Sequence, residues 1–362
     1  MKILTVIGAR PQFVKAAIMS REMAKHNGLQ EIIIHTGQHF DNNMSAVFFE
    51  EMQIPLPQYS LNINGMGHGA MTGQMMEEIE KVMLQEKPDA VLVYGDTNST
   101  LAGALTAAKQ HVPVMHIEAG LRSFNMKMPE EINRILTDRI STLLFCPTDS
   151  AIANLQAEGF ANYHCRYFKV GDVMEDSALY YSKLSVDKST IINTLGLKDK
   201  KFVLCTIHRA ENTDNINNLK AIITALNEIN DTVQVVLPLH PRTKKILDAN
   251  KITPEFTIIE PVGYFDMLQL LQNCSLVLTD SGGLQKEAFF FSKYCITLRE
   301  ETEWVELVEN SYNFIAGTDT DKIINLADEL VKKPYPEKKN LYGNGNAAAN
   351  ICKIMLDYFG IK

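Results

Sequence analysis

Short apolar runs alternate with amphipathic stretches along the first half of this 362-residue chain. The runs are rich in Val, Ile and Leu and have the length of strands, and the stretches between them have the spacing of helices. Strands this apolar are buried on both faces, which is typical of a parallel sheet covered by helices. We therefore expect a doubly wound α/β domain over residues 1–165. The expected strands are Ile3–Ile7, Glu31–His35, Ala90–Tyr94, Val114–Glu118 and Leu143–Pro147, and the expected helices are Phe13–His26, Met44–Met52, Gly69–Gln85 and Thr97–Gln110.

The same alternation restarts in the second half and predicts a second Rossmann-like domain over residues 166–345. A polar stretch at 182–200 is expected in the hinge region, and a helix at 346–362 is expected to pack back on the first domain. Two such domains predict a cleft at the carboxyl ends of their strands, where ligands of these folds bind. The expected strands are Lys201–Thr206, Val233–Pro238, Thr257–Ile259, Leu276–Asp280 and Cys295–Leu298, and the expected helices are Asn215–Ile229, Tyr264–Asn273, Leu284–Phe291 and Asp321–Lys332.

Charge and composition exclude several classes of function. The net charge is −8 and the pI about 5.7, and no basic stripe of the kind that binds nucleic acid is visible. No run reaches the roughly 18 apolar residues of a membrane span. The N-terminus starts with a strand pattern instead of a signal peptide, so we expect a cytoplasmic protein. Its six cysteines have no C-x-x-C spacing and are interpreted as buried thiols in a reducing compartment.

Three carboxylates follow neighbouring elements of the first domain. Asp96 comes after one expected strand, Glu118 closes another, and Glu130 opens a helix. Each also has a simple structural explanation: a turn residue, an ion pair with Arg122, and an acidic first turn favoured by the helix dipole. Inverting a sugar carbon by removing and returning a proton needs two acid/base groups, and a third can assist the leaving group. We therefore interpret the three as candidate catalytic residues.

Basic residues and glycine turns supply candidate anion ligands. Arg10 and Lys15 lie near the N-terminus of the helix that follows the first strand, and Arg134 shares a helix face with Glu130. In the second domain, a His-Arg pair follows the first strand, and a Ser-Gly-Gly turn before a helix exposes backbone N–H groups suited to phosphate. A glutamate one turn further along can accept ribose hydroxyls. The candidate ligands in this domain are His208, Arg209, Ser281, Gly282, Gly283 and Glu287.

Taken in order, six motifs resemble those of the non-hydrolysing UDP-N-acetylglucosamine 2-epimerases, and the resemblance covers nearly the whole chain. The order of the motifs is more specific than any one of them. A G-x-G-x-x-G fingerprint for NAD is absent. The motifs are Gly8-x-Arg-Pro, Gly95-Asp-Thr, His116-x-Glu-Ala-Gly-Leu-Arg, Pro129-Glu-Glu-x-Asn-Arg, His208-Arg and Thr279-Asp-Ser-Gly-Gly-x-Gln-x-Glu.

The resemblance implies a fold, a reaction and roles for residues. The family has the two-domain GT-B fold, usually forms homodimers, needs no metal or NAD, and makes sugars for cell-surface polysaccharides. It interconverts UDP-GlcNAc and UDP-ManNAc through a 2-acetamidoglucal formed as UDP leaves. By motif, Asp96, Glu118 and Glu130 would be the acid/base groups, and His208 would assist catalysis. The diphosphate would be bound by Arg10, Lys15, Arg134 and Arg209. The phosphate and ribose would also be bound by Ser281, Gly282, Gly283 and Glu287.

Several alternatives stay open at this point. The segments 208–213 and 301–306 look more like a branch that includes the 2-epimerases of UDP-2,3-diacetamido-2,3-dideoxyglucuronate. A hydrolysing 2-epimerase is disfavoured by Pro11 and Gln12, where those relatives look like Ala-Asp. A GT-B glycosyltransferase or a non-catalytic UDP-sugar binder would not need the three carboxylates, although fold alone does not decide function.

Overall fold

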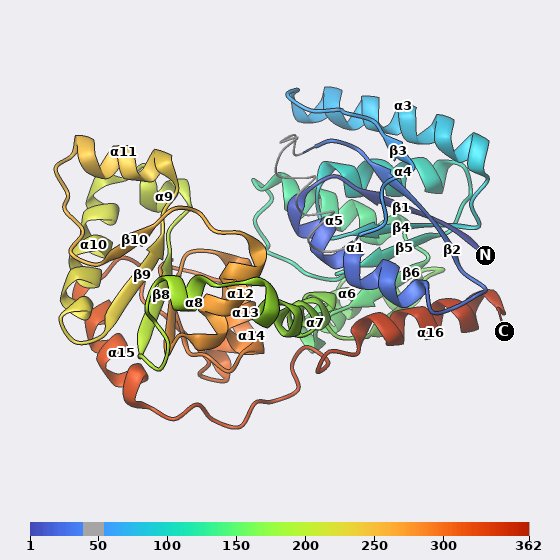
Figure 1. Cartoon of the computed structure of the whole chain (residues 1–362). Coiled ribbons are helices and arrows are strands. Elements are labelled where there is room, and N and C mark those ends of the chain that lie inside the picture. The colour runs from blue at the N-terminus through green and yellow to red at the C-terminus, as the bar shows by residue number, and fades with distance from the viewer. Residues whose placement is uncertain (39–53, 362) are drawn as a thin grey trace. The chain divides into compact units, whose positions relative to one another are not determined.

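The computed structural model describes residues 1–38 and 54–361, and the chain forms two compact units (Figure 1). Unit 1 consists of Met1–Ser177 together with Asn340–Lys362, and unit 2 consists of Ala178–Lys339. Each unit is built around one parallel sheet with helices on its faces. The expectation of two doubly wound parallel-sheet domains is therefore confirmed.

The sheet of unit 1 has the strand order β3-β2-β1-β4-β5-β6-β7, and all of its pairings are parallel. The chain reverses its direction of winding between β1 and β4, which makes the carboxyl ends of these two strands the switch point of the sheet. The five predicted strands are present, and the short edge strands β3 and β7 lacked a sufficiently apolar pattern to be predicted. The bounds are β1 Lys2–Ile7, β2 Gln30–His35, β3 Tyr59–Ser60, β4 Ala90–Tyr94, β5 Val114–Ile117, β6 Leu143–Cys146 and β7 Arg166–Lys169.

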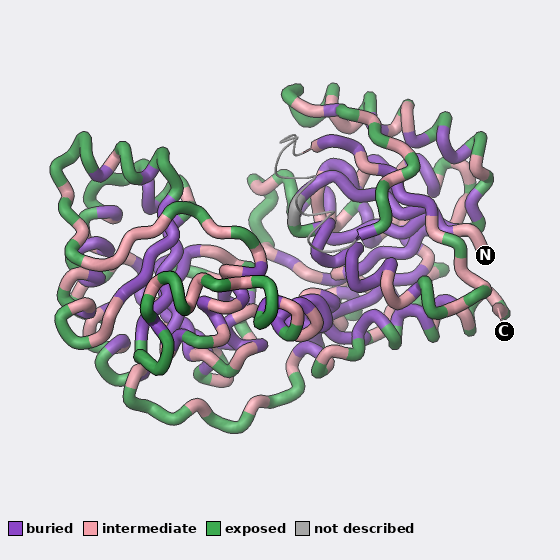
Figure 2. Tube along the Cα trace, viewed as in Figure 1, coloured by how far each residue is buried: buried purple, intermediate pink, exposed green. Residues whose placement is uncertain are grey.

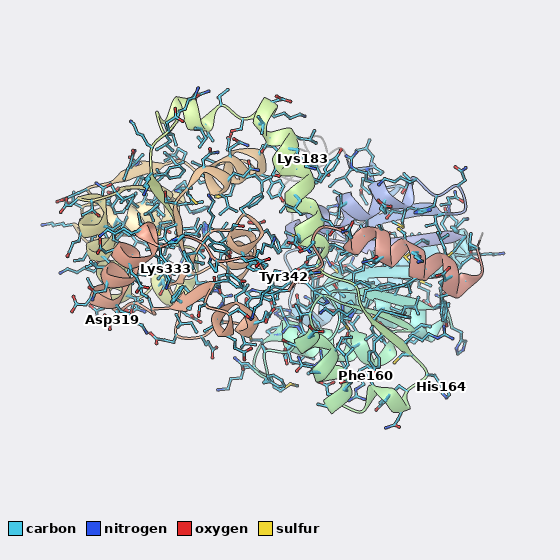
Figure 3. All side chains as sticks on the ribbon, turned by 90° about the horizontal axis from the view of Figure 1, so that it is seen from below. Phe160, His164, Lys183, Asp319, Lys333 and Tyr342 are labelled. Carbon is cyan, nitrogen blue, oxygen red and sulfur yellow. The ribbon has the colours of Figure 1, made fainter. Side chains whose placement is uncertain are left out.

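Helices cover both faces of this sheet, and the last helix, α16, packs against α1. The backbone N–H of Asp172 donates to the carbonyl of the fully buried Tyr342, labelled in Figure 3, at 2.7 Å. The predicted helix Met44–Met52 and the side chain of Arg10 lie outside the described part of the chain. The helices of this unit, with α7 continuing into unit 2, are α1 Arg10–Met23, α3 His68–Glu86, α4 Asn98–Lys109, α5 Pro129–Ile140, α6 Asp149–Ala157, η1 Phe160–Asn162, α7 Val173–Lys188 and α16 Ala347–Phe359.

The sheet of unit 2 has the order β10-β9-β8-β11-β12-β13 and is also parallel, so its switch point lies between β8 and β11. The strands are β8 Phe202–Thr206, β9 Gln234–Pro238, β10 Thr257–Ile259, β11 Leu276–Thr279, β12 Cys295–Thr297 and β13 Asn313–Ile315. The helices are α8 Ile191–Thr194, α9 Ala210–Thr213, α10 Ile216–Asn230, α11 Pro241–Ala249, α12 Tyr264–Asn273, α13 Gly282–Phe290, α14 Val305–Glu309 and α15 Thr320–Lys332.

Burial follows the apolar runs that predicted the strands (Figure 2). Every residue of β4, β8 and β11 is buried, as expected for strands with helices on both faces. Each fully buried Val, Leu or Ile side chain contributes about 1.5–3 kcal/mol relative to an exposed one, so these strands anchor the loops that follow them. Within residues 1–38 and 54–361, no helix is long and apolar enough to cross a membrane.

The cysteines lie mainly in the cores of the two units. Five of the six are buried and Cys165 is half-buried, and all six are free thiols. Burial raises the pKa of Cys274 and of Cys352 to about 12. Because the thiolate is the reactive form, these side chains act as small apolar groups.

Candidate active site

Five of the six motifs lie where strands end, at or beside the switch points of the two sheets, and the motif that begins at Pro129 opens α5. In unit 1 the loops of the first three motifs leave β1, β4 and β5, and in unit 2 those of the last two leave β8 and β11. Carboxyl ends of parallel strands meet at one edge of a sheet, where open α/β folds bind their ligands. Each unit therefore presents its motif residues at the edge that such folds use for binding.

Glu118 leaves β5 in a left-handed backbone conformation, with φ = 70°, which is uncommon for a residue other than glycine. Its carboxylate forms an ion pair with the ammonium of Lys15 on α1, and both side chains are largely buried. Gly95 packs against this pair, since a Cβ there would lie 3.3 Å from Glu118 Oε2 and 3.5 Å from Lys15 Nζ. The fold thus places the carboxylate of Glu118, whose backbone is strained, beside the turn between β4 and α4. There it is paired with the ammonium of Lys15.

Asp96, at the end of the neighbouring strand, is held by two residues of α5. Arg134 forms an ion pair with the Asp96 carboxylate, and Asn133 Nδ2 donates to the Asp96 carbonyl at 2.9 Å. The second N–H arm of Arg134 donates to Glu131 Oε2 at 2.7 Å. Glu130, which was expected to share a helix face with Arg134, lies exposed in the first turn of α5, and Arg134 pairs with Glu131 instead.

Glu131 is the residue that fixes the loop before α5. Its carboxylate accepts hydrogen bonds from the backbone N–H and the hydroxyl of Ser123 and from the backbone N–H of Phe124, each at 2.9 Å. Burial by itself would raise the Glu131 pKa, but the Ser123 and Phe124 donors and the Arg134 charge outweigh it and lower that pKa. Glu131 therefore acts as an ionised anchor, and its side chain is only 1% exposed.

Glu131→Gln should reduce the free energy of unfolding by about 2 kcal/mol at neutral pH, because charge-assisted hydrogen bonds are lost in a buried site. The folded-state pKa is depressed, so this stabilisation is present above the unfolded value of about 4.5 and is lost as the pH falls through the folded-state value. Urea denaturation of both proteins between pH 7 and pH 3, at about unit steps, measures the gap between their free energies of unfolding. A gap between wild type and variant that stays constant with pH would contradict this role of Glu131.

Gln12 connects the first motif loop to the second. Its side-chain oxygen accepts from the backbone N–H groups of Gly8 and Ala9, at 2.8 and 3.0 Å, at the start of α1. Its amide nitrogen donates to the carbonyl of Tyr94, the last residue of β4, at 2.8 Å. Gln12 is 2% exposed, so the bridge is buried. The side chain therefore holds the turns that carry Arg10 and Asp96 in a fixed relation.

Asp280 organises the corresponding edge of unit 2. Its carboxylate is fully buried and accepts from the backbone N–H groups of His208 and Arg209, at 3.0 and 3.1 Å, and from Asn212 Nδ2 at 3.0 Å. The turn after β8 is thus tied to the end of β11 across the switch point. The side chain of His208 is exposed and that of Arg209 half-buried, so both are available to a ligand.

The Ser-Gly-Gly turn forms the N-terminus of α13. Ser281 is the N-cap, and its hydroxyl accepts from the backbone N–H of Leu284 at 3.5 Å. Behind the turn, the indole N–H of Trp304 donates to the carbonyl of Gly282 at 2.9 Å. The ammonium of the buried Lys286 lies 4.1 Å from the centre of the indole ring, a cation–π contact. The turn is therefore braced from behind while its N–H groups point towards the helix N-terminus, a position suited to phosphate.

On the expectation that this turn binds a phosphate of UDP, Gly282→Ala should weaken the binding of UDP about tenfold, because a Cβ at Gly282 would lie 2.1 Å from Glu303 Oε1. Glu303 cannot move freely, since Arg299 holds its other oxygen at 2.8 Å. The matched variant is Gly283→Ala, whose Cβ meets only Ser281 Oγ at 3.9 Å, and its loss should be clearly smaller. Trp304 is the only tryptophan of the chain, so UDP titrations followed by its fluorescence measure both affinities. Equal affinities for the two variants would contradict this account of the turn.

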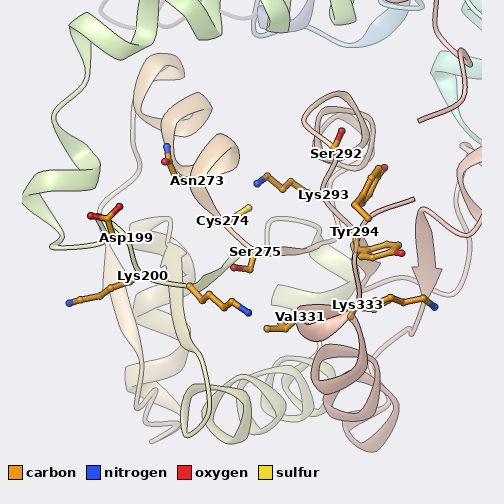
Figure 4. A pocket seen from close by; sticks show the side chains of 13 residues that line it. Asp199, Lys200, Asn273, Cys274, Ser275, Ser292, Lys293, Tyr294, Val331 and Lys333 are labelled. Carbon is orange, nitrogen blue, oxygen red and sulfur yellow. The ribbon is translucent and has the colours of Figure 1, made fainter. Parts of the chain in front are cut away.

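A hollow of about 430 Å³ lies elsewhere in unit 2 (Figure 4). It is lined by residues just before β8, β11 and β12, so it lies at the amino ends of these strands, away from the motif loops. Lysines contribute to its lining, but Lys200 and Lys333 point away from it, and Lys293 points inward. The hollow is therefore not part of the candidate site.

The structure brings some predicted residues together and leaves others apart. Lys15 pairs with Glu118 and Arg134 with Asp96, whereas Arg122, which was considered as a partner of Glu118, binds Asp138 and Glu158 instead. Sequence reasoning did not select four residues that hold the loops in place. Three of them were visible within the motifs: the carboxylate directly before Ser-Gly-Gly, and the second glutamate and the asparagine of Pro-Glu-Glu-x-Asn-Arg. The four residues are Gln12, Glu131, Asn133 and Asp280.

Comparison with known proteins decides the family. A model of the UDP-N-acetylglucosamine 2-epimerase family matches residues 21–356. The chain belongs to this family. Within it, the chain is 54% identical over 356 residues to the UDP-2,3-diacetamido-2,3-dideoxy-D-glucuronate 2-epimerase of Pseudomonas aeruginosa, covering 98% of this chain and 99% of that protein. It is 43% identical over 366 residues to the UDP-N-acetylglucosamine 2-epimerase of Methanocaldococcus jannaschii, covering 98% and 99%.

Solved structures of family members share the fold. The M. jannaschii UDP-GlcNAc 2-epimerase in complex with UDP-GlcNAc and UDP matches with a TM-score of 0.85 and 42% identity, over 99% of this chain and 100% of that one. The Neisseria meningitidis enzyme bound to UDP-GlcNAc matches with a TM-score of 0.86 and 33% identity, over 99% and 100%. These relatives have the GT-B-like fold, so the expected fold family is confirmed.

Proposed function

We propose that this epimerase inverts carbon 2 of a UDP-linked 2-acetamido sugar, using carboxylates of unit 1 for proton transfer and the switch-point loops of unit 2 for UDP. The observation that carries the proposal is the pair of carboxylates at the unit 1 switch point. Glu118 is held by Lys15 in a strained backbone conformation, and Gly95, the residue before Asp96, packs against it. Strained residues held by their surroundings concentrate at functional sites. A transferase or a passive binder has no need for this arrangement.

In the proposed reaction a carboxylate takes the proton from C2, and the electron pair of the C2–H bond forms a C1–C2 double bond. The bond between C1 and the UDP oxygen breaks with its electron pair, so UDP leaves as an anion and a 2-acetamidoglucal remains. UDP then adds back to C1 while a protonated carboxylic acid delivers a proton to the opposite face of C2. The proton and charge balance closes within the site, with two acid/base groups exchanging roles.

We assign roles to the predicted residues accordingly. Asp96, Glu118 and Glu130 are the acid/base carboxylates. The growing negative charge on departing UDP would be stabilised by cationic groups, in the manner of other preorganised sites. These groups are Arg10, Lys15, Arg134, His208 and Arg209, and the remaining UDP ligands are Ser281, Gly282, Gly283 and Glu287.

Of the two candidate sugars, the comparisons favour UDP-2,3-diacetamido-2,3-dideoxyglucuronate over UDP-GlcNAc. The relative that acts on the diacetamido sugar is 54% identical, against 43% for the M. jannaschii UDP-GlcNAc enzyme and 32% for that of Escherichia coli K12. The segments at 208–213 and 301–306 favour the same branch. UDP-GlcNAc remains the second candidate because most of the named relatives carry that activity in their names.

Initial rates with the two sugars decide between them. The purified protein is incubated with each UDP-sugar in the absence of any acceptor, and the manno epimer is quantified by anion-exchange chromatography. We expect kcat/KM to be at least about tenfold higher for the diacetamidoglucuronate, a difference of 1.4 kcal/mol in transition-state binding. A preference for UDP-GlcNAc would reverse the substrate assignment, and no epimer from either sugar would contradict the proposed reaction.

We further propose a cytoplasmic homodimer that supplies sugars for a cell-surface polysaccharide. Exposed apolar side chains support self-association: Ile132 and Leu136 lie one turn apart on α5, and Phe124 and Met126 in the preceding loop are 79% and 61% exposed. Light scattering on the purified protein should give twice the mass of the 40.7 kDa chain. A monomer mass at micromolar concentration would contradict the dimer.

A further inference from the structure

His116 lies in the middle of the catalytic edge of unit 1 but cannot touch a ligand, because it is fully buried within β5. Its Nδ1 lies 2.8 Å from Asp138 Oδ1, and its Nε2 lies 2.7 Å from the carbonyl oxygen of Gly95. A carbonyl and a carboxylate only accept hydrogen bonds. Nε2 of His116 therefore donates to the Gly95 carbonyl, and Nδ1 faces the Asp138 carboxylate.

Further donors fix the carboxylate of Asp138. Its second oxygen accepts from the backbone N–H of Gly120 at 3.1 Å and from Arg122 Nη1 at 2.7 Å. Arg122 is fixed in turn by two hydrogen bonds to Glu158, at 2.6 and 2.9 Å. The Asp138 carboxylate is therefore fixed by three groups and holds the His116 ring in place. Arg139 also lies 3.7 Å from Glu158, so two arginines and two carboxylates meet in this cluster.

The cluster holds both turns that carry the catalytic carboxylates. The His116 ring fixes the carbonyl of Gly95, directly before Asp96, and Asp138 fixes the N–H of Gly120, two residues after Glu118. Gly95, Glu118 and Gly120 all have left-handed backbones, with φ of 62°, 70° and 80°. Such conformations persist at a non-glycine residue only when surrounding contacts impose them. The hydrogen bonds of this cluster are contacts of that kind.

We propose that His116 and Asp138 are positioning residues for the epimerase reaction: the buried His116 ring sets the place of Asp96 against Glu118 through the Gly95 carbonyl. The inference rests on the proposed function, since the effect of this clamp is defined through epimerisation. It assigns to the first residue of the His-x-Glu motif a role that involves no contact with substrate.

Two substitutions of His116 separate its two hydrogen bonds. His116→Gln places an amide N–H near the position of Nε2, so it can still donate to Gly95 and loses Asp138. His116→Asn places its amide near Nδ1, so it can still donate to Asp138 and loses Gly95. We expect kcat to fall at least about 30-fold for His116→Asn but less than about fivefold for His116→Gln, with KM of both close to wild type. Equal losses in kcat for the two variants would overturn the proposal.

Two readouts separate this effect from simple loss of structure. UDP affinity, followed by the fluorescence of Trp304 in unit 2, should be unchanged in both variants, and circular dichroism sets an assay temperature below both unfolding transitions. If wild type itself gives no epimer, the proposed function fails and not this inference. Independently of any variant, nitrogen-15 NMR of histidine-labelled wild type should show a proton on Nε2 of His116, as its hydrogen bond to the Gly95 carbonyl requires. A deprotonated Nε2 would overturn the proposal even if neither variant folds.

Discussion

Glu118→Gln should lower kcat for C2 epimerisation about a thousandfold, within the range measured when a general acid or base is removed. The amide keeps the shape of the side chain but cannot accept the C2 proton, and it leaves the Lys15 ammonium without its buried counter-charge. The ligands that we assign to the nucleotide in unit 2 are untouched, so KM and UDP affinity should change by less than about threefold. A steady-state assay with the preferred UDP-sugar and a UDP titration measure the two quantities.

The matched control for this prediction is Glu77→Gln. Glu77, like Glu118, is paired with a lysine, since Lys81 Nζ lies 3.1 Å from its carboxylate, but it is 66% exposed on α3. Exposed pairs of this kind contribute little to stability, so this variant should behave as wild type. If the kcat of Glu118→Gln stayed within tenfold of wild type, Glu118 would not be an acid/base group of the reaction.

Asp280→Ala should abolish detectable UDP binding at concentrations where wild type is saturated. Three donors lose their acceptor in a fully buried place, which we estimate to cost about 3 kcal/mol of stability. More importantly, the backbone of His208 and Arg209 is no longer tied to the end of β11, so the two cations move relative to the Ser-Gly-Gly turn. Calorimetry with UDP, alongside thermal unfolding, separates loss of binding from loss of fold.

Asp214→Ala is the control for Asp280→Ala. Asp214 follows α9 and pairs with Arg242 at 2.6 Å, but both side chains are about half exposed. This variant should keep the UDP affinity of wild type and lose less than about 1 kcal/mol of stability. If Asp280→Ala bound UDP as well as Asp214→Ala does, the assigned organisation of the unit 2 loops would be wrong.

Hydrophobic patterning predicted the fold well because the central strands are buried on both faces. Runs such as Ala90–Tyr94 and Leu276–Thr279 have no polar position to obscure them, and their ends were correct within one residue. The pattern missed the edge strands β3, β7 and β13, although it predicted the edge strand β10. Arg166–Lys169 in β7 has charged residues at both ends and only partial burial, so its pairing with β6 depends on tertiary context.

The candidate site was less predictable, because sequence spacing does not choose between neighbouring partners. Arg122 follows Glu118 closely in sequence, yet the left-handed turn between them directs Arg122 to Asp138, 16 residues away, while Lys15 arrives from α1. At Pro-Glu-Glu, the two glutamates differ by 100° around the helix, and which one faces the interior depends on how α5 packs. Motif order identified the family, and the contacts between loops required the fold.

The most direct test of the account is proton NMR of the enzyme with UDP-2,3-diacetamido-2,3-dideoxyglucuronate, and separately with UDP-GlcNAc, in D₂O. We predict that deuterium enters C2 as the manno epimer forms, that UDP remains attached in the product, and that Glu118→Gln abolishes both signals. Exchange at C2 requires the C–H bond to break at a base in contact with solvent. An epimer without deuterium, release of free sugar, or no exchange with either substrate would contradict reversible C2 deprotonation at this site.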